Sequence, residues 1–410
     1  MFRKRRKKNA VIKVFGIITA IGVVSVLMYT FFGVKTYALS ADSGALSTVI
    51  TNKEDALTPP EISAKAAVLI DAKTGQIVYG KNENERLPMA STTKIMTTLL
   101  MLESGGLETE FVMGPEILVE GSSMGLLEGD LVSKLDLCYG MMLPSGNDAA
   151  NATAYILGGG TAGFSELMNR KAATLGMINS HFITPSGLHA ANHYSTASDM
   201  AILTRAALEN PDFAKIAATE SIKLEYGNPP YKRWLSNSNK LLSLYDGCIG
   251  VKTGFTDEAG RCLISAAERG GVKLICCTLD APNDWADHTK LLNYGFEAVK
   301  AVEAEFNAPE DFAIDVVGGD ADEVPLSLER KPIFMSVKGE IPEFDCSIIL
   351  PEFIYAPVTA GQTVGRAEFI YDGNVVDEVS IIAGENVEKI TRKQPKALYY
   401  VIIDFLKKYV

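Results

Sequence analysis

The chain has 410 residues, of which 47% are hydrophobic and 22% charged, values typical of a globular protein long enough for two domains. Residues 1–40 carry a charge of +8 and residues 391–410 carry +4, which leaves −23 on residues 41–390 within the net charge of −11. A body this acidic repels phosphate backbones, so the composition argues against nucleic acid as a partner.

The N-terminus is typical of an export segment. A basic stretch, FRKRRKK, precedes a nearly uncharged apolar run over residues 11–34, and small residues offer cleavage points after Ala38, Ser40 or Ala41. The run is also long enough to span a bilayer, so an uncleaved anchor is the alternative. We therefore predict a signal peptide or signal anchor over residues 1–40, which delivers the rest of the chain to the outer face of the membrane.

A polar linker over residues 41–61 leads into an α+β domain, predicted over residues 62–300. Residues 64–82 predict a β-hairpin around a Thr-Gly turn, and three further strand-like runs begin at residues 248, 260 and 272. Apolar residues at helical spacing predict helices over 91–104, 131–142, 147–157, 163–175, 197–208 and 284–297. This order favours an antiparallel sheet with helices laid against it.

The last quarter of the chain has a different character. Residues 303–386 consist of short strand-like pieces with a hairpin signal at the Asp-Gly-Asn of 372–374, and they predict a small all-β domain. Residues 391–410, if helical, have one apolar and one basic face, as does a helix lying in a membrane surface. A last helix packed on its own domain is the alternative.

The stretch PMASTTKIMT places Ser91 three residues before Lys94 at the start of a predicted helix. Residues at i and i+3 share a helix face, so the two side chains are expected side by side. Serine is a poor nucleophile without a base in hydrogen-bond reach, and a lysine serves as that base when burial or a nearby cation lowers its pKa. An N-cap serine beside a surface lysine is the simpler alternative.

Two further stretches favour the catalytic interpretation. MLPSGNDAA places Ser145 and Asn147 in a loop before a helix, from which a hydroxyl and an amide reach a cleft. GVKTGFT places Lys252, Thr253 and Gly254 on a strand. There the glycine lets a substrate backbone lie close, while lysine and threonine offer charge and hydrogen bonds.

S-x-x-K, S-x-N and K-T-G, in this order, form the active-site set of penicillin-recognising serine enzymes. With these motifs, residues 67–97, 181–201 and 239–269 resemble low-molecular-mass penicillin-binding proteins, specifically serine-type D-alanyl-D-alanine carboxypeptidases. The resemblance covers residues 60–300, and the β domain with an amphipathic tail fits the layout of that family. It implies a penicillin-binding, β-lactamase-like transpeptidase fold.

The resemblance also implies the reaction. Ser91 would attack the carbonyl between the two terminal D-alanines of a peptidoglycan stem peptide, and Lys94 would take its proton. Ser145 would relay a proton to the leaving amine, and water would release the shortened peptide. β-Lactam antibiotics would acylate the same serine, and neither a metal nor an organic cofactor is implied.

The remaining site residues implied by the resemblance bind the substrate. Asn147 would orient its amide, and Lys252 and Thr253 would hold its terminal carboxylate next to Gly254. The backbone N–H groups of the nucleophile and of Phe255 would form the oxyanion hole.

One residue departs from this pattern. After LDAPN the family leads us to expect a basic residue for the substrate carboxylate, but this chain has Asp284. Either Asp284 faces away or carboxylate recognition depends on Lys252 and Thr253 alone. Asp284 keeps open the alternative of a catalytically weak cell-wall-binding scaffold. A DD-endopeptidase of the same fold is a variant of the main interpretation. A class A β-lactamase is a further alternative, but it would carry S-D-N and a deacylating glutamate and would lack the β domain and the membrane tail.

The cysteines and histidines predict no metal site. Six irregularly spaced cysteines indicate buried free thiols, with a single Cys248–Cys262 bridge as the alternative in an exported protein. His189 and His193 are four residues apart, but their stretch has the composition of a loop and lacks the glutamate of a zinc-binding helix.

Overall fold

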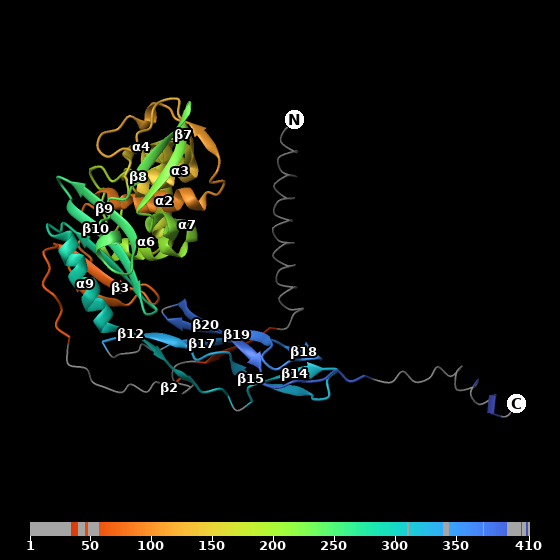
Figure 1. The fold of residues 1–410 in the computed structure, drawn as a ribbon. Coiled ribbons are helices and arrows are strands. Elements are labelled where there is room, and N and C mark those ends of the chain that lie inside the picture. The colour runs from red at the N-terminus through yellow and green to blue at the C-terminus, as the bar shows by residue number, and fades with distance from the viewer. Residues whose placement is uncertain are drawn as a thin grey trace, which may run out of the picture. The chain divides into compact units, whose positions relative to one another are not determined.

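The structure is a computed structural model. It describes residues 57–391 apart from 310, 339–343 and 372, together with 34–39, 46–47, 403, 407 and 408. The chain divides into two compact units, which Figure 1 shows. The α+β unit comprises residues 50–302 and 335–341, and the β unit comprises residues 1–49, 303–334 and 342–410.

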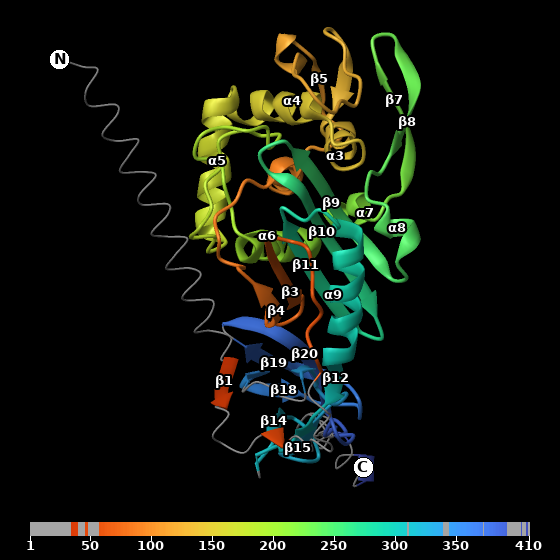
Figure 2. The same ribbon diagram turned by 90° about the vertical axis from the view of Figure 1, so that its left-hand side faces the viewer.

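A five-stranded antiparallel sheet forms the centre of the α+β unit. Its order is β4-β3-β11-β10-β9, with β3 at Ala66–Asp71, β4 at Ile77–Lys81, β9 at Cys248–Thr256, β10 at Gly260–Arg269 and β11 at Val272–Leu279. Helices α6 (Ala197–Glu209) and α9 (Asp284–Ala298) pack against this sheet (Figure 2). Every residue of β3 is buried, because both faces of the strand are covered.

A group of helices supplies the rest of the core. The 3₁₀ turn η2 (Ala90–Thr93) runs directly into α2 (Lys94–Glu103), eight of whose ten residues are buried. The other helices are α3 (Lys134–Met142), α4 (Asn147–Gly158), α5 (Thr161–Thr174), α7 (Pro211–Ala217), α8 (Leu241–Leu244) and the 3₁₀ turn η3 (Pro115–Ile117). Short strands complete the unit: β5 (Glu110–Val112), β6 (Leu131–Ser133), β7 (Ser221–Gly227) and β8 (Pro230–Ser236).

The predicted α+β class and its main elements are confirmed, with several differences in detail. Helix α3 begins at Lys134 rather than at residue 131, because residues 131–133 pair with β5. Ser133 then caps the helix, since its hydroxyl accepts a hydrogen bond from the backbone N–H of Asp136. The other elements of this unit that were not predicted are helices α7 and α8, the 3₁₀ turn η3, the β5–β6 pair and the β7–β8 hairpin.

The β unit confirms the predicted all-β domain. Its seven-stranded sheet has the order β1-β17-β19-β20-β15-β14-β18. Tyr371 lies opposite Asn374, so β19 and β20 form the hairpin predicted around 372–374. Phe334 stacks on Phe344 with ring centroids 4.1 Å apart and meets Phe369 edge to face, which gives the unit an aromatic core. The strands from β12 onward are β12 (Val299–Glu303), β13 (Glu305–Phe306), β14 (Ala313–Val317), β15 (Glu323–Leu328), β16 (Ile333–Val337), β17 (Asp345–Pro351), β18 (Phe353–Tyr355), β19 (Thr363–Tyr371) and β20 (Asn374–Ala383).

The N-terminal region contributes two strands to the β unit. Residues Val34–Leu39 form β1, which pairs antiparallel with β17, and Leu46–Ser47 form β2, which pairs with β13. β1 thus lies inside the segment predicted for export, and cleavage after Ser40 would remove the whole strand. The apolar run ahead of it and most of the C-terminal helix predicted at 391–410 lie outside the described residues.

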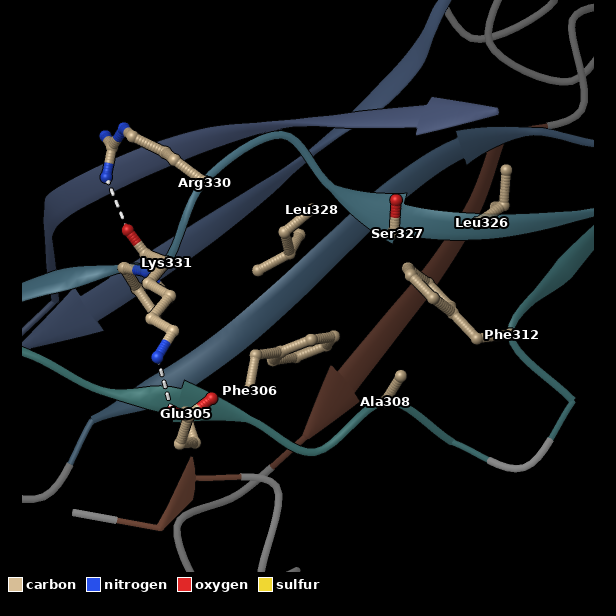
Figure 3. A pocket seen from close by; sticks show the side chains of 10 residues that line it. Glu305, Phe306, Ala308, Phe312, Leu326, Ser327, Leu328, Arg330 and Lys331 are labelled. Atoms are coloured by element: carbon tan, nitrogen blue, oxygen red, sulfur yellow. Dashed lines mark hydrogen bonds and ion pairs between the residues drawn. The ribbon is translucent and has the colours of Figure 1, made fainter. Parts of the chain in front are cut away.

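A pocket of about 390 Å³ opens in the β unit (Figure 3). Phe306, Phe312 and Leu328 line it together with other apolar side chains. The two basic side chains at its edge are already paired: Lys331 with Glu305, and Arg330 with Asp377. The lining of the pocket is therefore largely apolar, and each charged side chain among the described residues that line it has an ion-pair partner.

The structure records all six cysteines as free thiols. The alternative bridge is not formed: Cys262 is a buried free thiol, and the thiol of Cys248 donates to the carbonyl of Gly250. The default interpretation of free thiols is confirmed, with Cys248 partly exposed.

Candidate active site

Ser91 and Lys94 meet at the junction of η2 and α2. In a 3₁₀ turn, side chains at i and i+3 eclipse one another, which brings the two residues to the same side. The Lys94 Nζ donates a hydrogen bond to the Ser91 Oγ at 2.8 Å. Ala90, just before the serine, has a φ of +48°, an uncommon value for a residue with a side chain and one that clusters at functional sites.

Lys94 is fully buried, and its amine is held by polar groups from three parts of the chain. In addition to Ser91, Nζ donates to the Asn147 Oδ1 at 2.7 Å and to the Ser186 carbonyl at 2.8 Å. Desolvation, followed by repulsion from the nearby Lys252, lowers the pKa of Lys94 well below its ordinary value. In the neutral form, the same 2.8 Å contact lets the Ser91 hydroxyl donate to the amine.

Ser145 and Asn147 come from the turn that opens α4. Asn147 is the first residue of the helix, and its Nδ2 donates to the Glu120 carbonyl at 2.7 Å, which directs its Oδ1 toward Lys94. Ser145 is buried and has a φ of +66°. Such conformations cost about 1–3 kcal/mol and persist where the surrounding structure fixes them.

The neighbouring Asp148, which is not one of the predicted site residues, organises the loop over this site. Its carboxylate accepts hydrogen bonds from the Ser123 hydroxyl and from the backbone N–H groups of Met124, Gly125 and Leu126. These bonds tie the segment that follows Glu120 to the first turn of α4. The only sequence signal for this role is an acid at a helix start, where carboxylates are favoured.

Strand β9 closes the other side of the Ser91 turn. A Cβ at Gly254 would lie 3.0 Å from the backbone N of Ser91 and 3.1 Å from that of Thr92, so the strand and the turn are in direct contact. Lys252 is buried, its Nζ donates to the Thr253 carbonyl at 3.0 Å, and desolvation lowers its pKa to about 7. Phe255, the next residue after the glycine, is 62% exposed.

We expect Gly254→Ala to lower kcat/KM at least about tenfold, because the added methyl group pushes β9 and the Ser91 turn apart, and small displacements of reacting groups are costly. Steady-state peptide hydrolysis and thermal unfolding measure the effect. Gly80→Ala on β4 is the matched control, since its Cβ would meet only the flexible Glu83 carboxylate. Unchanged kinetics in Gly254→Ala would contradict the tight contact.

The loop that carries Ser186 is held by a histidine. The backbone N–H groups of Ile183 and Thr184 donate to the His193 Nδ1 at 2.9 and 3.2 Å, and the His193 Nε2 lies 2.9 Å from the Thr93 Oγ1. Desolvation lowers the pKa of His193 to about 4, so the ring is neutral. No group of three or more metal-ligating side chains occurs in the part of the chain that the structure describes.

Asp284 is buried and faces an arginine. Its carboxylate accepts hydrogen bonds from the Arg261 Nη2, which lies 2.9 Å from each oxygen. The sequence alone does not indicate a partner for this acid. Arg261 is distant in sequence and belongs to β10, beside the strand that carries Lys252.

Comparisons with known proteins show the family to which the chain belongs. The family model described as D-alanyl-D-alanine carboxypeptidase matches residues 53–283. DacF of Bacillus subtilis is 34% identical over 350 residues, which cover 82% of this chain and 90% of that protein. This chain belongs to the D-alanyl-D-alanine carboxypeptidase family. It is therefore a serine-type hydrolase of the penicillin-binding class.

Other comparisons extend this match over different shares of the chain. DacC of Escherichia coli is 32% identical over 82% of this chain and 87% of its own length. The Streptomyces K15 DD-transpeptidase structure is 34% identical with a TM-score of 0.56, over 58% of this chain and 99% of that one. The model of the penicillin-binding protein 5 C-terminal domain matches residues 296–389, which include strands β12 to β20.

Proposed function

We propose that this protein removes the terminal D-alanine from peptidoglycan stem peptides through an acyl-enzyme on Ser91. The buried Lys94 amine, 2.8 Å from the Ser91 hydroxyl and low in pKa, carries the proposal. The serine oxygen attacks the carbonyl carbon between the two D-alanines, and its proton passes to Lys94. The C–N bond then breaks as this proton passes from Lys94 through the Ser145 hydroxyl to the leaving amine, which leaves Lys94 neutral again, and water hydrolyses the ester.

In this proposal, the remaining residues bind the substrate. Asn147 orients the substrate amide, and the backbone N–H groups of Ser91 and Phe255 stabilise the oxyanion. Lys252 and Thr253 face the terminal carboxylate, and Gly254 lets the substrate lie along β9. β-Lactam antibiotics acylate Ser91 by the same attack, which makes penicillin a covalent probe.

The test is to label the full chain with penicillin, digest it and locate the adduct by mass spectrometry, alongside D-alanine release from a peptide ending in D-Ala-D-Ala. We expect the adduct on the peptide that contains Ser91, together with D-alanine release. An adduct without release supports the scaffold alternative, and cleavage of cross-linked dimers alone supports the endopeptidase. An adduct on another residue refutes the proposed nucleophile.

We expect KM for the carboxylate substrate to rise as the pH increases through about 7. The pKa of Lys252 is about 7 because the amine is buried, so it is cationic below this pH and neutral above it. A neutral amine attracts a carboxylate less, whereas a substrate whose carboxylate is a methyl ester should show a flatter profile. The test is to measure KM for the acid and for the ester between pH 6 and 9. The same dependence of KM on pH for both substrates would contradict the role of Lys252.

We also propose a division of the chain in which residues 1–40 direct export, 41–61 link, 62–300 catalyse and 303–386 form the β domain. The basic charge at both ends of an acidic chain supports contact between residues 391–410 and an anionic membrane surface. The enzyme would then act outside the cytoplasmic membrane. None of the helices within the described residues is long and apolar enough to cross a membrane.

A further inference from the structure

The site proposed above has to bind an anion, yet a carboxylate lies in the same region of the sheet. Asp284 is the first residue of α9, its side chain is only 4% exposed, and it places a negative charge against β10, the strand next to β9. Left alone, this charge would repel a substrate carboxylate. Its partner is Arg261, whose Nη2 lies 2.9 Å from both carboxylate oxygens.

Arg261 lies next to the strand that carries the K-T-G motif. In the β9–β10 ladder it is directly opposite Phe255, and Thr253 lies two residues before Phe255 on the same face. Diagonal neighbours of this kind are separated by about 7–8 Å, which is within reach of an arginine side chain. Figure 2 shows β9 and β10 side by side, with α9 against the sheet.

The guanidinium keeps part of its binding capacity. Its side chain is 43% exposed, and only Nη2 has a recorded hydrogen-bond partner among the residues that the structure describes. Nε and Nη1 remain to donate to a second acceptor. Arginine keeps its charge at every pH at which the enzyme works, and its planar donors match a carboxylate.

We propose that Arg261, held in place by the buried Asp284, binds the terminal carboxylate of the substrate together with Thr253. The assignment rests on the proposed function, since it presumes that the substrate lies along β9. Asp284 then fixes the arginine and is neutralised by it, and the exposed donors of the guanidinium face the substrate. The competing interpretation is an ion pair that only joins α9 to β10.

Arg269 provides a matched control. It lies at the far end of the same strand, its side chain is 34% exposed, and it pairs with Asp246. Its guanidinium also lies over the rings of Tyr245 and Phe296. Arg269 therefore makes packing and ion-pair contacts at the other end of β10, away from the K-T-G motif.

The test measures kcat and KM of the full chain on a peptide ending in D-Ala-D-Ala and on the same peptide as its terminal methyl ester. For Arg261→Gln we expect KM for the acid to rise about tenfold or more, as for loss of a charged hydrogen bond, with the ester kinetics within about twofold of wild type. Arg261→Lys should recover part of the affinity, and Arg269→Gln should change neither substrate.

A double variant, Arg261→Gln with Asp284→Asn, leaves no unpaired buried carboxylate and must show the same acid-specific loss. Equal losses on acid and ester, or an unchanged KM for the acid, would overturn the assignment. A wild-type protein that cleaves neither peptide would instead overturn the proposed function, and the assignment with it.

Discussion

Replacing Ser91 by alanine is expected to abolish both D-alanine release and covalent labelling by penicillin. The substitution removes the only atom proposed to form the acyl bond, and loss of a catalytic serine lowers kcat by roughly 10⁴-fold or more in serine hydrolases. The fold should persist, because the contact recorded for the Ser91 side chain is the hydrogen bond from Lys94. The free energy of unfolding should change by only about 1 kcal/mol.

The measurement is single-turnover acylation together with thermal unfolding of the same preparation. Ser104→Ala is the control: this serine follows the C-terminus of α2, and its hydroxyl donates to the Met101 carbonyl. The control should retain wild-type kinetics. Residual penicillin labelling of Ser91→Ala at the wild-type rate would show that the nucleophile lies elsewhere.

The Ser91–Lys94 pair was predictable because the two residues are only three positions apart in the sequence. A three-residue spacing at a helix start fixes which side chains face each other, and η2 followed by α2 places the two residues accordingly. The partners of the lysine were not predictable in this way. Asn147 and Ser186 are 53 and 92 residues away from it, and only the packing of α4 and the 183–188 loop against α2 brings them to the amine.

The β7–β8 hairpin was missed although its pattern is present in the sequence. Ile222, Leu224 and Tyr226 alternate with charged residues, and Asn-Pro-Pro follows at the turn, which is the signature of a half-exposed hairpin. The Arg261–Asp284 pair, in contrast, has no local signal. It depends on the register of β10 and on where α9 begins, and neither is encoded within a few residues.

Lys94→Met is expected to slow acylation by about 10²- to 10⁴-fold, the usual contribution of a general base, while folding stability is retained. Methionine fills a similar volume but accepts no proton from Ser91. Lys94→Arg should not rescue the rate, because a guanidinium stays protonated. Acylation by wild type should fall as the pH drops through the lowered pKa of Lys94. Lys134→Met, at the start of α3, is the control and should acylate normally.

The stability of Lys94→Met tests whether Lys94 is a structural residue or a buried catalytic base. Because the pKa of Lys94 is lowered in the folded state, the unfolded chain takes up a proton at this lysine more readily than the folded chain does. This linkage lowers the free energy of unfolding of wild type at pH values below the pKa of the lysine in the unfolded chain. Lys94→Met removes that linkage but leaves the Asn147 Oδ1 and the Ser186 carbonyl without their donor. We therefore expect an unfolding free energy at neutral pH equal to or above that of wild type, measured by denaturant unfolding. A variant that is both inactive and strongly destabilised would indicate a structural lysine, whereas an inactive but stable one indicates a buried base kept at the expense of stability.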